Sequence, residues 1–342
     1  MATTTDKLIY SGSQAARVAW YFGHYLSTRR RATPTLRPVK PSTKPQGRVP
    51  KRMELIQALR RLFATDWQNI KRGVYLRPEF GDPAKLLSRS QDYFQDLREV
   101  DRRRVNKIND EVAIAPDLPR YYQQNFHYQS DGWMSRESAE RYDFQVETLF
   151  TGAADAMRRQ ALPSIRAVIA DGDQRQMHLL DVACGTGRFL REVKRNFPAL
   201  KVTGLDLSPA YLEKAGEMLS GLRKTDLIEA NAEAIPLPDR SQDVVTCIYL
   251  FHELPPKIRP RIAAEISRVL KPGGQFIFVD SIQPGDVPDY DKMLSYFPMH
   301  FHEPYFASYG ATDLDALFGT VGLKRTSTTL AFLSKVAVYQ PA

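Results

Sequence analysis

Short apolar segments alternate with amphipathic segments from residue 178 onward, and this alternation restricts the possible folds more than any other feature of the chain. Strands that alternate with helices form a parallel sheet with helices on both faces, so the pattern predicts an α/β fold. The expected strands are 178–183, 201–207, 226–230, 243–250 and 275–280, followed by 323–329 and 334–339. The expected helices are 188–197, 209–220, 257–270 and 312–320.

Composition excludes several other classes of protein. Apolar residues make up 43% and charged residues 25% of the chain, which is ordinary for a globular protein. No apolar stretch reaches the roughly 18–20 residues of a membrane-spanning helix. Cys184 and Cys247 are too few for a disulfide scaffold, and they suit a reducing compartment. We therefore expect a cytoplasmic protein.

Basic charge is concentrated at the N-terminus. Residues 1–61 contain 13 Lys and Arg but only Asp6 and Glu54, whereas the rest of the chain contains 35 basic and 37 acidic residues. We predict two parts of different character. Residues 1–120 form a basic, Pro-containing helical extension, and residues 121–342 form the α/β domain.

The extension contains three helical candidates and one proline-rich segment. The candidates are 7–28, 51–63 and 84–108, and five prolines in 34–50 predict an extended segment there. Three hypotheses stay open: a cap that packs on the domain, a peripheral membrane contact through residues 1–61, and a targeting peptide over residues 1–50. A nucleic-acid partner is not favoured, because the basic residues adjoin a proline run rather than a reading motif.

A glycine-rich turn follows the first expected strand and points to a nucleoside ligand. Gly185 and Gly187 allow the backbone to turn tightly and to approach a ligand closely. The second strand ends in Asp206, whose carboxylate can accept hydrogen bonds from both ribose hydroxyls. A dinucleotide site would need a third glycine where this chain has Leu190, which disfavours NAD.

Five sequence blocks in this order resemble the class I S-adenosylmethionine (SAM) methyltransferases: DVACGTGRF, GLDLSPAYL, ANAEAIPLPD, DVVTCIYLFHELP and RVLKPGGQFIFVD. Within that class the chain is similar to the ubiquinone/menaquinone C-methyltransferases and related small-molecule methyltransferases. The resemblance covers residues 121–342. It implies a Rossmann-like, seven-stranded, mostly parallel sheet with an antiparallel last strand, and it implies SAM as the cofactor.

The resemblance also implies which residues hold SAM. The turn from Asp181 to Gly187 would hold the methionine part, Asp206 the ribose and Leu207 the adenine. Ala183 stands where the family most often has glycine, which still leaves the backbone close to the ligand. The full set of expected SAM-binding residues is Asp181, Ala183, Gly185, Thr186, Gly187, Asp206, Leu207, Asn231, Ala232, Glu233, Tyr249 and Tyr128.

Three residues are candidates for catalysis. His252 follows the fourth strand, where the methyl group should point, and could act as a general base or orient the acceptor. His127 lies in the segment that precedes the sheet. Tyr305 lies in the aromatic segment 293–309, which in this family often lines the acceptor pocket.

Metal binding is a weaker possibility in the same aromatic segment. His300, His302 and Glu303 could ligate a metal, but His-x-His without another convincing ligand is a weak signal, so we assign no metal.

The sequence therefore predicts an enzyme that methylates a hydrophobic small molecule, such as a quinol, phenol or lipid, on carbon or oxygen. Two other hypotheses stay open. One is a SAM-binding assembly or regulatory protein without turnover, and the other is a protein or RNA methyltransferase that docks through the basic extension.

Overall fold

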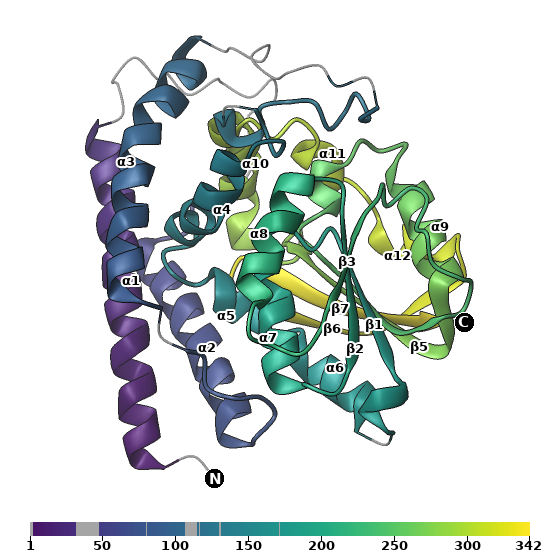
Figure 1. The fold of residues 1–342 in the computed structure, drawn as a ribbon. Helices are drawn as coiled ribbons and strands as arrows, with labels where there is room; N and C mark the ends of the chain where they lie inside the picture. The colour runs from purple at the N-terminus through teal and green to yellow at the C-terminus, as the bar shows by residue number, and fades with distance from the viewer. Residues whose placement is uncertain are drawn as a thin grey trace.

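A computed structural model describes residues 3–31, 48–79, 81–106, 115, 117–129, 131–170 and 172–342. Its centre is a seven-stranded sheet in the order β3-β2-β1-β4-β5-β7-β6, with helices on both faces (Figure 1). β7 runs antiparallel to both of its neighbours, β5 and β6, whereas the other neighbouring pairs are parallel. The predicted α/β fold with an antiparallel last strand is therefore confirmed.

The strands are β1 (His178–Val182), β2 (Lys201–Asp206), β3 (Asp226–Glu229), β4 (Gln242–Ile248), β5 (Leu270–Ser281), β6 (Leu323–Ala331) and β7 (Ser334–Pro341). The α-helices are α1 (Thr4–Arg31), α2 (Arg52–Lys71), α3 (Pro83–Asn106), α4 (Arg136–Leu149), α5 (Ala154–Arg159), α6 (Leu162–Ile169), α7 (Arg188–Asn196), α8 (Pro209–Leu219), α9 (Arg259–Val269), α10 (Asp291–Phe301), α11 (Phe306–Gly310) and α12 (Leu314–Gly319). The 3-10 helices are η1 (Phe126–Tyr128), η2 (Gln174–Gln176), η3 (Phe251–Glu253) and η4 (Pro288–Tyr290).

Successive residues of β1 belong to two separate apolar clusters, one on each face of the sheet. Leu179 packs with side chains of α6 and α7, and Leu180 packs with side chains of α9 and α12. Both leucines are fully buried. A strand covered on both faces needs a continuous apolar run, which explains why this segment is readable in the sequence.

Helix starts on the sheet follow local rules. Ser208 Oγ accepts a hydrogen bond from the Tyr211 amide at 3.3 Å, and Pro209 occupies the first position of α8. A side-chain cap followed by proline is a strong start signal because it satisfies a free amide and presets φ. The short helices α4 to α6 were not among the predicted elements.

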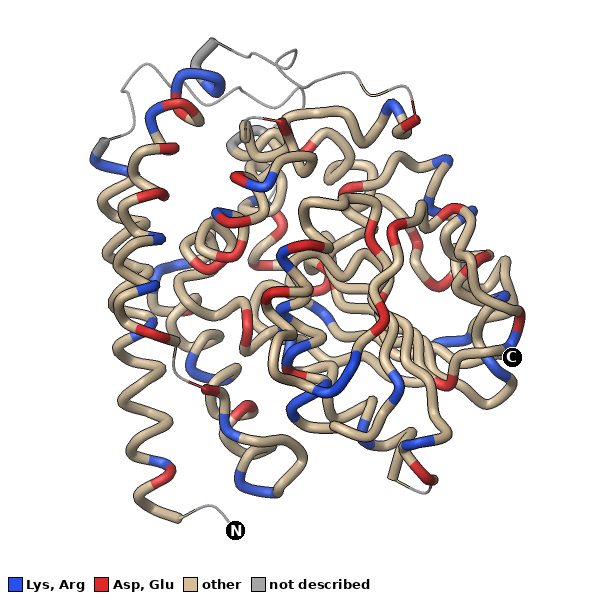
Figure 2. The backbone as a smooth tube through the Cα atoms, in the orientation of Figure 1, with Lys and Arg blue, Asp and Glu red and all other residues tan. Residues whose placement is uncertain are grey.

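The helices α1, α2 and α3, here called the helical layer, lie beside the sheet (Figure 1). Long stretches of α1 carry no charged residue, whereas α3 carries charges of both signs (Figure 2). Tyr10 of α1 and Trp67 of α2 belong to the same buried cluster as Leu179 of β1. Part of the helical layer thus shares the main core.

Buried ion pairs fasten the helical layer. Asp66 of α2 receives two hydrogen bonds from the Arg159 guanidinium, at 2.7 and 3.0 Å, and the hydroxyls of Tyr10 and Tyr75 donate to it at 2.7 and 2.6 Å. The Asp66 and Arg159 side chains are 0% and 3% exposed. Two buried charges are tolerated only when they satisfy one another in this way.

A second ionic network joins α1 to the turn after β1. Arg17 pairs with the carboxylates of Glu147 and Asp155 at 2.5 and 2.9 Å. Arg188, the first residue of α7, pairs with Asp155 at 2.6 Å. Burial opposes the charge on Asp155, but Arg188 and Arg17 outweigh it and hold the pKa of that carboxyl well below its ordinary value.

The expected extended segment 34–50 lies outside the described residues except for 48–50. The division of the chain at residue 120 stays a prediction. Among the described residues, no helix combines the length and apolar character needed to cross a bilayer.

Candidate active site

The carboxyl ends of the parallel strands meet at one edge of the sheet. β1 lies between β2 and β4, so the strand order reverses at β1. A crevice for a ligand forms at such a reversal, because the connections leave in opposite directions. The residues that follow β1 to β4 therefore define the candidate site.

The two glycines after β1 serve different purposes. Both have positive φ, at 56° for Gly185 and 71° for Gly187. A Cβ added at Gly185 would meet no atom within 4 Å, so open space lies next to it. A Cβ added at Gly187 would lie 2.9 Å from Ala215 Cβ, so this glycine allows α7 and α8 to approach. Gly185 faces the crevice, and Gly187 is needed for packing.

Asp206 connects the glycine turn to the next helix. Its carboxylate accepts hydrogen bonds from the backbone amides of Gly185 at 2.8 Å and Ser208 at 2.9 Å. Burial raises the pKa of Asp206, and these amides oppose the rise. Leu207 follows it and is half-buried.

Asp181 is a second carboxyl group at this edge, and it is buried. It accepts a hydrogen bond from Thr246 Oγ1 at 2.6 Å, and its residue is 2% exposed. Burial raises the pKa of Asp181 to about 7, although the Thr246 hydroxyl opposes the rise. A cationic ligand beside it would favour the ionised form.

The residues after β3 are held by one another. Glu233 accepts hydrogen bonds from the Tyr121 hydroxyl at 2.7 Å and from Arg261 at 3.1 Å. The Glu233 amide donates to Asn231 Oδ1 at 2.9 Å, and Ala232 between them is buried. The side chains of Asn231 and Glu233 are thus fixed at the edge of the crevice.

Sequence reasoning missed several residues that fix the site. Tyr121 holds Glu233, and the Trp133 carbonyl accepts hydrogen bonds from Ser208 Oγ at 2.6 Å and from the Tyr122 hydroxyl at 3.2 Å. The segment before the sheet therefore contacts the ends of β2 and β3. No motif marks the contacts of Tyr121 with Glu233 and of Trp133 with Ser208, because they join residues 112 and 75 positions apart.

Thr186 is directed toward helix α4. Its hydroxyl donates to Asp143 Oδ1 at 2.9 Å, and the residue is 3% exposed.

Cys184 and Cys247 are both buried, and burial raises the pKa of each thiol well above its ordinary value. Neither cysteine is positioned to act as a nucleophile, since the thiolate form is disfavoured.

A cavity of 1410 Å³ lies between α1, α2, α10 and the end of β4. Its lining is mostly apolar and includes Val18, Phe22, Ile56, Leu59, Phe63 and Phe297. Several polar side chains also line it: His127, Tyr249, His252, Glu253 and Glu303. The cavity thus combines a mostly apolar lining with a polar cluster near the end of β4, and basic residues of α1 and α2 such as Lys7, Arg29 and Arg52 also line it.

His252 is held at this cavity by Asp280. Its Nδ1 lies 2.6 Å from Asp280 Oδ1, and its Nε2 lies 3.4 Å from Glu253 Oε1. Burial opposes the charge on His252, but the carboxylates of Asp280 and Glu253 outweigh it and raise the pKa of the imidazole well above its ordinary value. The ring orientation is therefore fixed from both sides.

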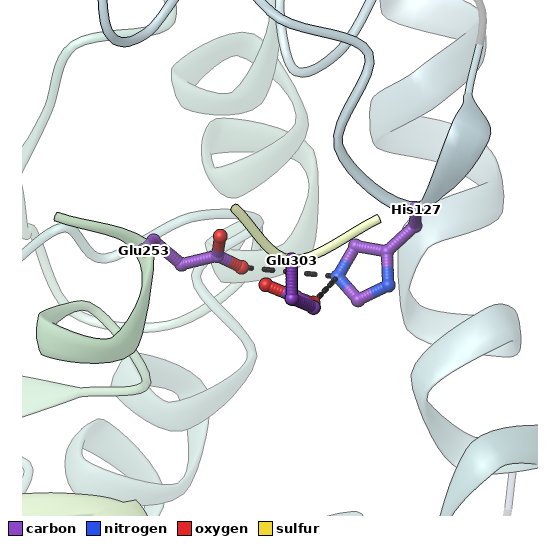
Figure 3. A group of neighbouring side chains, drawn as sticks. All are labelled: His127, Glu253 and Glu303. Carbon is purple, nitrogen blue, oxygen red and sulfur yellow. Dashed lines mark ion pairs between the residues drawn. The ribbon is translucent and has the colours of Figure 1, made fainter. Parts of the chain in front are cut away.

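His127 lies next to two carboxylates (Figure 3). Its Nε2 is 3.0 Å from Glu303 Oε1 and 3.8 Å from Glu253 Oε1. Burial opposes the charge on His127, but Glu303 and Glu253 raise the pKa of the imidazole above its ordinary value. The two catalytic candidates His127 and His252 are thus brought together around Glu253.

The three tyrosine candidates lie in different surroundings. Tyr249 lines the cavity, and its hydroxyl is 2.7 Å from Ser334 Oγ. The Tyr305 hydroxyl accepts a hydrogen bond from Gln124 at 2.7 Å, and Tyr305 is not among the cavity-lining residues. The ring of Tyr128 lies 5.2 Å from the ring of His302. The side chain of His300 lies outside the described part of the chain.

Comparison with known proteins shows that the α/β part of the chain is similar to methyltransferases. Residues 179–274 match the family described as "Methyltransferase domain". The ubiquinone/menaquinone biosynthesis C-methyltransferase UbiE of Methylobacterium nodulans is 35% identical over 163 residues, which cover 46% of this chain and 61% of the relative. A demethylmenaquinone methyltransferase of Symbiobacterium thermophilum is 34% identical over 150 residues, covering 43% of this chain and 57% of the relative.

A fatty-acid O-methyltransferase of Mycolicibacterium smegmatis is 27% identical over 151 residues, covering 43% of this chain and 52% of the relative. The chain thus spans between half and two thirds of the length of these curated relatives. Among solved structures, a SAM-dependent methyltransferase from Aquifex aeolicus aligns with 60% of this chain and 97% of its own, at 17% identity and a TM-score of 0.43.

The sheet order, the glycine turn and the matched domain together define a Rossmann-like methyltransferase domain. The domain is similar to the class I SAM-dependent methyltransferases, and the sequence-based recognition of that class is confirmed.

SAM is the cofactor of this domain, and the crevice fits it. Gly185 leaves open space next to the turn, and the carboxyl groups of Asp181, which is buried, and of Asp206, which is half-buried, lie at the crevice. SAM carries a sulfonium and an ammonium group that suit such carboxylates, and its ribose hydroxyls can donate to Asp206. The assignment of individual residues to parts of SAM stays a prediction.

Proposed function

We propose that this enzyme transfers the methyl group of SAM to a hydrophobic small molecule bound in the 1410 Å³ cavity. The cavity is the observation that carries the proposal, because apolar side chains dominate its lining and burying apolar surface drives binding of lipophilic molecules. The relatives named for quinone biosynthesis and for fatty acids support an acceptor of the same character, such as a quinol, phenol or lipid.

The strand order supports a methyl group directed toward this cavity. β4 is the neighbour of β1, and Tyr249 and His252, which follow β4, line the cavity. SAM bound at the turn after β1 supplies an electrophilic methyl group. The role of His252 in this proposal is to orient the acceptor, since Asp280 fixes its ring at 2.6 Å.

The length of the cavity favours an acceptor with a long chain. Its lining on α1 runs from Lys7 to Arg29, which is about 33 Å of helix at 1.5 Å per residue. A compact phenol would leave most of this surface uncovered. We therefore propose a polar or aromatic head near His127 and His252, with an apolar chain along α1 and α2.

Two alanines of α1 give a matched test of the acceptor site. Both Ala16 and Ala19 are exposed on this helix, but Ala19 lines the cavity and Ala16 does not. With labelled SAM and a lipid extract, the wild-type chain should place label in an organic-soluble product. Ala19→Trp should lower kcat/KM for the acceptor by about tenfold or more without changing SAM affinity, and Ala16→Trp should change neither.

The two remaining hypotheses predict other results. SAM binding with no labelled product from any extract would favour a SAM-binding protein without turnover. Label in protein or RNA, with strongly salt-dependent binding, would favour a macromolecular acceptor. Equal activity of the two tryptophan variants would remove the cavity from the proposal.

We also propose that the exposed side of the helical layer contacts an anionic lipid surface. Leu8, Ile9 and Met53 are 69%, 42% and 56% exposed, and basic residues such as Lys7 and Arg52 lie beside them. Apolar side chains flanked by basic ones are typical of helices that bind at a membrane interface. Such a contact would allow a lipophilic acceptor to enter the cavity directly from the membrane.

Vesicle flotation of the full chain tests this contact. The wild-type chain should float with vesicles that contain anionic lipid and should be released by salt. Leu8→Ser combined with Ile9→Ser should reduce flotation. Leu330→Ser, which changes a leucine on β6 that is 52% exposed, should have no effect. Failure of the wild-type chain to float would remove the membrane from the proposal.

A further inference from the structure

We infer that His127, Glu253 and Glu303 form a binding site for one first-row divalent metal cation at the acceptor cavity. The three residues come from η1, η3 and the turn after α10, and each offers one ligand atom. These three atoms lie within 4.8 Å of one another (Figure 3). The sequence suggested His300, His302 and Glu303 as possible ligands. In the structure, the residues next to Glu303 are His127 and Glu253 instead.

Burial and missing hydrogen bonds point to an additional ligand at this cluster. The side chains of Glu303 and Glu253 are 0% and 6% exposed. Within the described part of the chain, Glu253 Oε2 and Glu303 Oε2 accept no hydrogen bond, and the polar partner of Glu303 Oε1 is His127 Nε2 at 3.0 Å. Burying a carboxylate oxygen without a partner is costly, and a cation would satisfy these oxygens together.

The donor set indicates the kind of cation. One imidazole nitrogen with two carboxylates suits Mn²⁺, Fe²⁺ or Zn²⁺, whereas Ca²⁺ and Mg²⁺ prefer oxygen ligands throughout. Metal–ligand distances of about 2.1 Å place donors at most about 4.2 Å apart. The cluster, with its donors within 4.8 Å, needs only a small contraction to reach that geometry.

The position of the site suggests its use. All three residues line the cavity, so the remaining coordination positions of a bound cation would face an acceptor there. A divalent cation can hold an oxygen substituent of the acceptor and lower the pKa of its hydroxyl group. This use depends on the proposed methyl transfer, whereas binding of the cation does not.

Titration of the chelator-treated full chain with Mn²⁺ tests the site without SAM or acceptor. Electron paramagnetic resonance of the free ion should show one bound Mn²⁺ per chain. Glu253→Gln and Glu303→Gln should each weaken binding by at least about tenfold. Glu265→Gln is the control, because Glu265 is hydrogen-bonded to Arg268 and to the Ile235 amide and does not line the cavity.

Two further measurements keep the result clear. Circular dichroism melts without metal identify any glutamine variant that fails to fold. If one of them does not fold, Mn²⁺ binding by His127→Gln is measured in place of that variant. The visible absorption of bound Co²⁺ should change in His127→Gln, because a nitrogen ligand is lost.

The absence of stoichiometric Mn²⁺ binding by the wild-type chain would overturn the inference. So would unchanged binding in folded Glu253→Gln and Glu303→Gln chains. Metal binding without any methyl transfer would leave the site in place and would contradict only the proposed function.

Discussion

The sheet buries β1 between two layers of helices through apolar contacts, whereas ion pairs fasten α1 and α2 to the rest of the chain, a half-buried one at Arg17 and a buried one at Asp66. Leu179 and Leu180 need only to be apolar to fill their places. Asp66 and Arg159 need one another, since each is buried and charged. Apolar packing tolerates substitution of similar volume, but a buried ion pair does not tolerate loss of one partner.

The sheet and the surrounding helices also have different expected functions. The ends of β1 to β3 carry the residues expected to bind SAM, while α1, α2 and α10 supply most of the apolar surface of the acceptor cavity. The polar cluster around Glu253 lies where the two regions meet. Substitutions at the ends of β1 to β3 should therefore change SAM binding, and substitutions in α1, α2 and α10 should change stability or the use of the acceptor.

The largest expected effect is the loss of the Asp66–Arg159 pair. Asp66→Ala leaves the guanidinium of Arg159 buried without its carboxylate, which should lower the free energy of unfolding by about 3–5 kcal/mol. Urea unfolding followed by circular dichroism measures this. Glu213→Ala removes an exposed partner of Arg136 and should change little. Similar values for both variants would contradict the role of the buried pair.

Loss of the Asp206 carboxylate should affect SAM rather than the helical layer. Asp206→Asn should weaken SAM binding by about 100-fold, because charged acceptors for the two ribose hydroxyls are lost. Isothermal titration calorimetry measures the affinity. Asp226→Asn, an exposed change at the start of β3, should leave it unchanged. Equal affinities in the two variants would place the nucleoside elsewhere.

SAM affinity should depend on pH through Asp181. Burial raises the pKa of Asp181 to about 7 in the unliganded chain, so a cationic ligand must displace a proton below that pH. Affinity should fall by about tenfold for each pH unit below 7 and level off above it. Calorimetry between pH 5.5 and pH 8.5 tests this, and Asp181→Asn should remove the slope.

The same group affects stability without SAM. The raised pKa means that the folded chain binds the proton more tightly than the unfolded chain. Proton binding by Asp181 therefore stabilises the folded chain. This stabilisation is fully present below the pKa of an unfolded aspartate, about 4, and it is lost as pH rises through about 7. The unfolding free energy of wild type relative to Asp181→Asn should therefore decline over that range, and a constant difference would contradict it.

The smallest expected effect concerns Ala183. Its φ of 58° is unfavourable for a residue with a Cβ, by about 1–2 kcal/mol. Ala183→Gly relieves this strain but gains unfolded-state entropy, so the free energy of unfolding should rise by up to about 1 kcal/mol. Ala263→Gly, inside α9, should lower it by about 1 kcal/mol or more. A drop in both variants would exclude strain at Ala183.

Much of the sheet could be predicted because its signals are local. The apolar run of β1, the cap formed by Ser208 and Pro209, and the turn after Asp181 each lie within a few residues. The contacts of Tyr121 with Glu233 and of Trp133 with Ser208 could not be predicted, because they join distant segments without a motif.

The candidate site shows the same limit. His252 was marked by its place after a strand, and the structure adds Asp280 as the residue that fixes it. The metal-ligating set expected from His300, His302 and Glu303 relied on sequence proximity. Folding instead brings His127 and Glu253 to Glu303, and these residues are separated by 50 positions or more in the chain.

The sequence by itself determined the strands β1 to β5 with the helices between them, the glycine turn and the carboxylate of Asp206, because backbone propensities and short motifs act over neighbouring residues. Only the tertiary structure decided that α1, α2 and α10 enclose a cavity and that His127, Glu253 and Glu303 face one another in it. Which distant side chains share a buried space depends on how whole elements pack, and no local pattern encodes that.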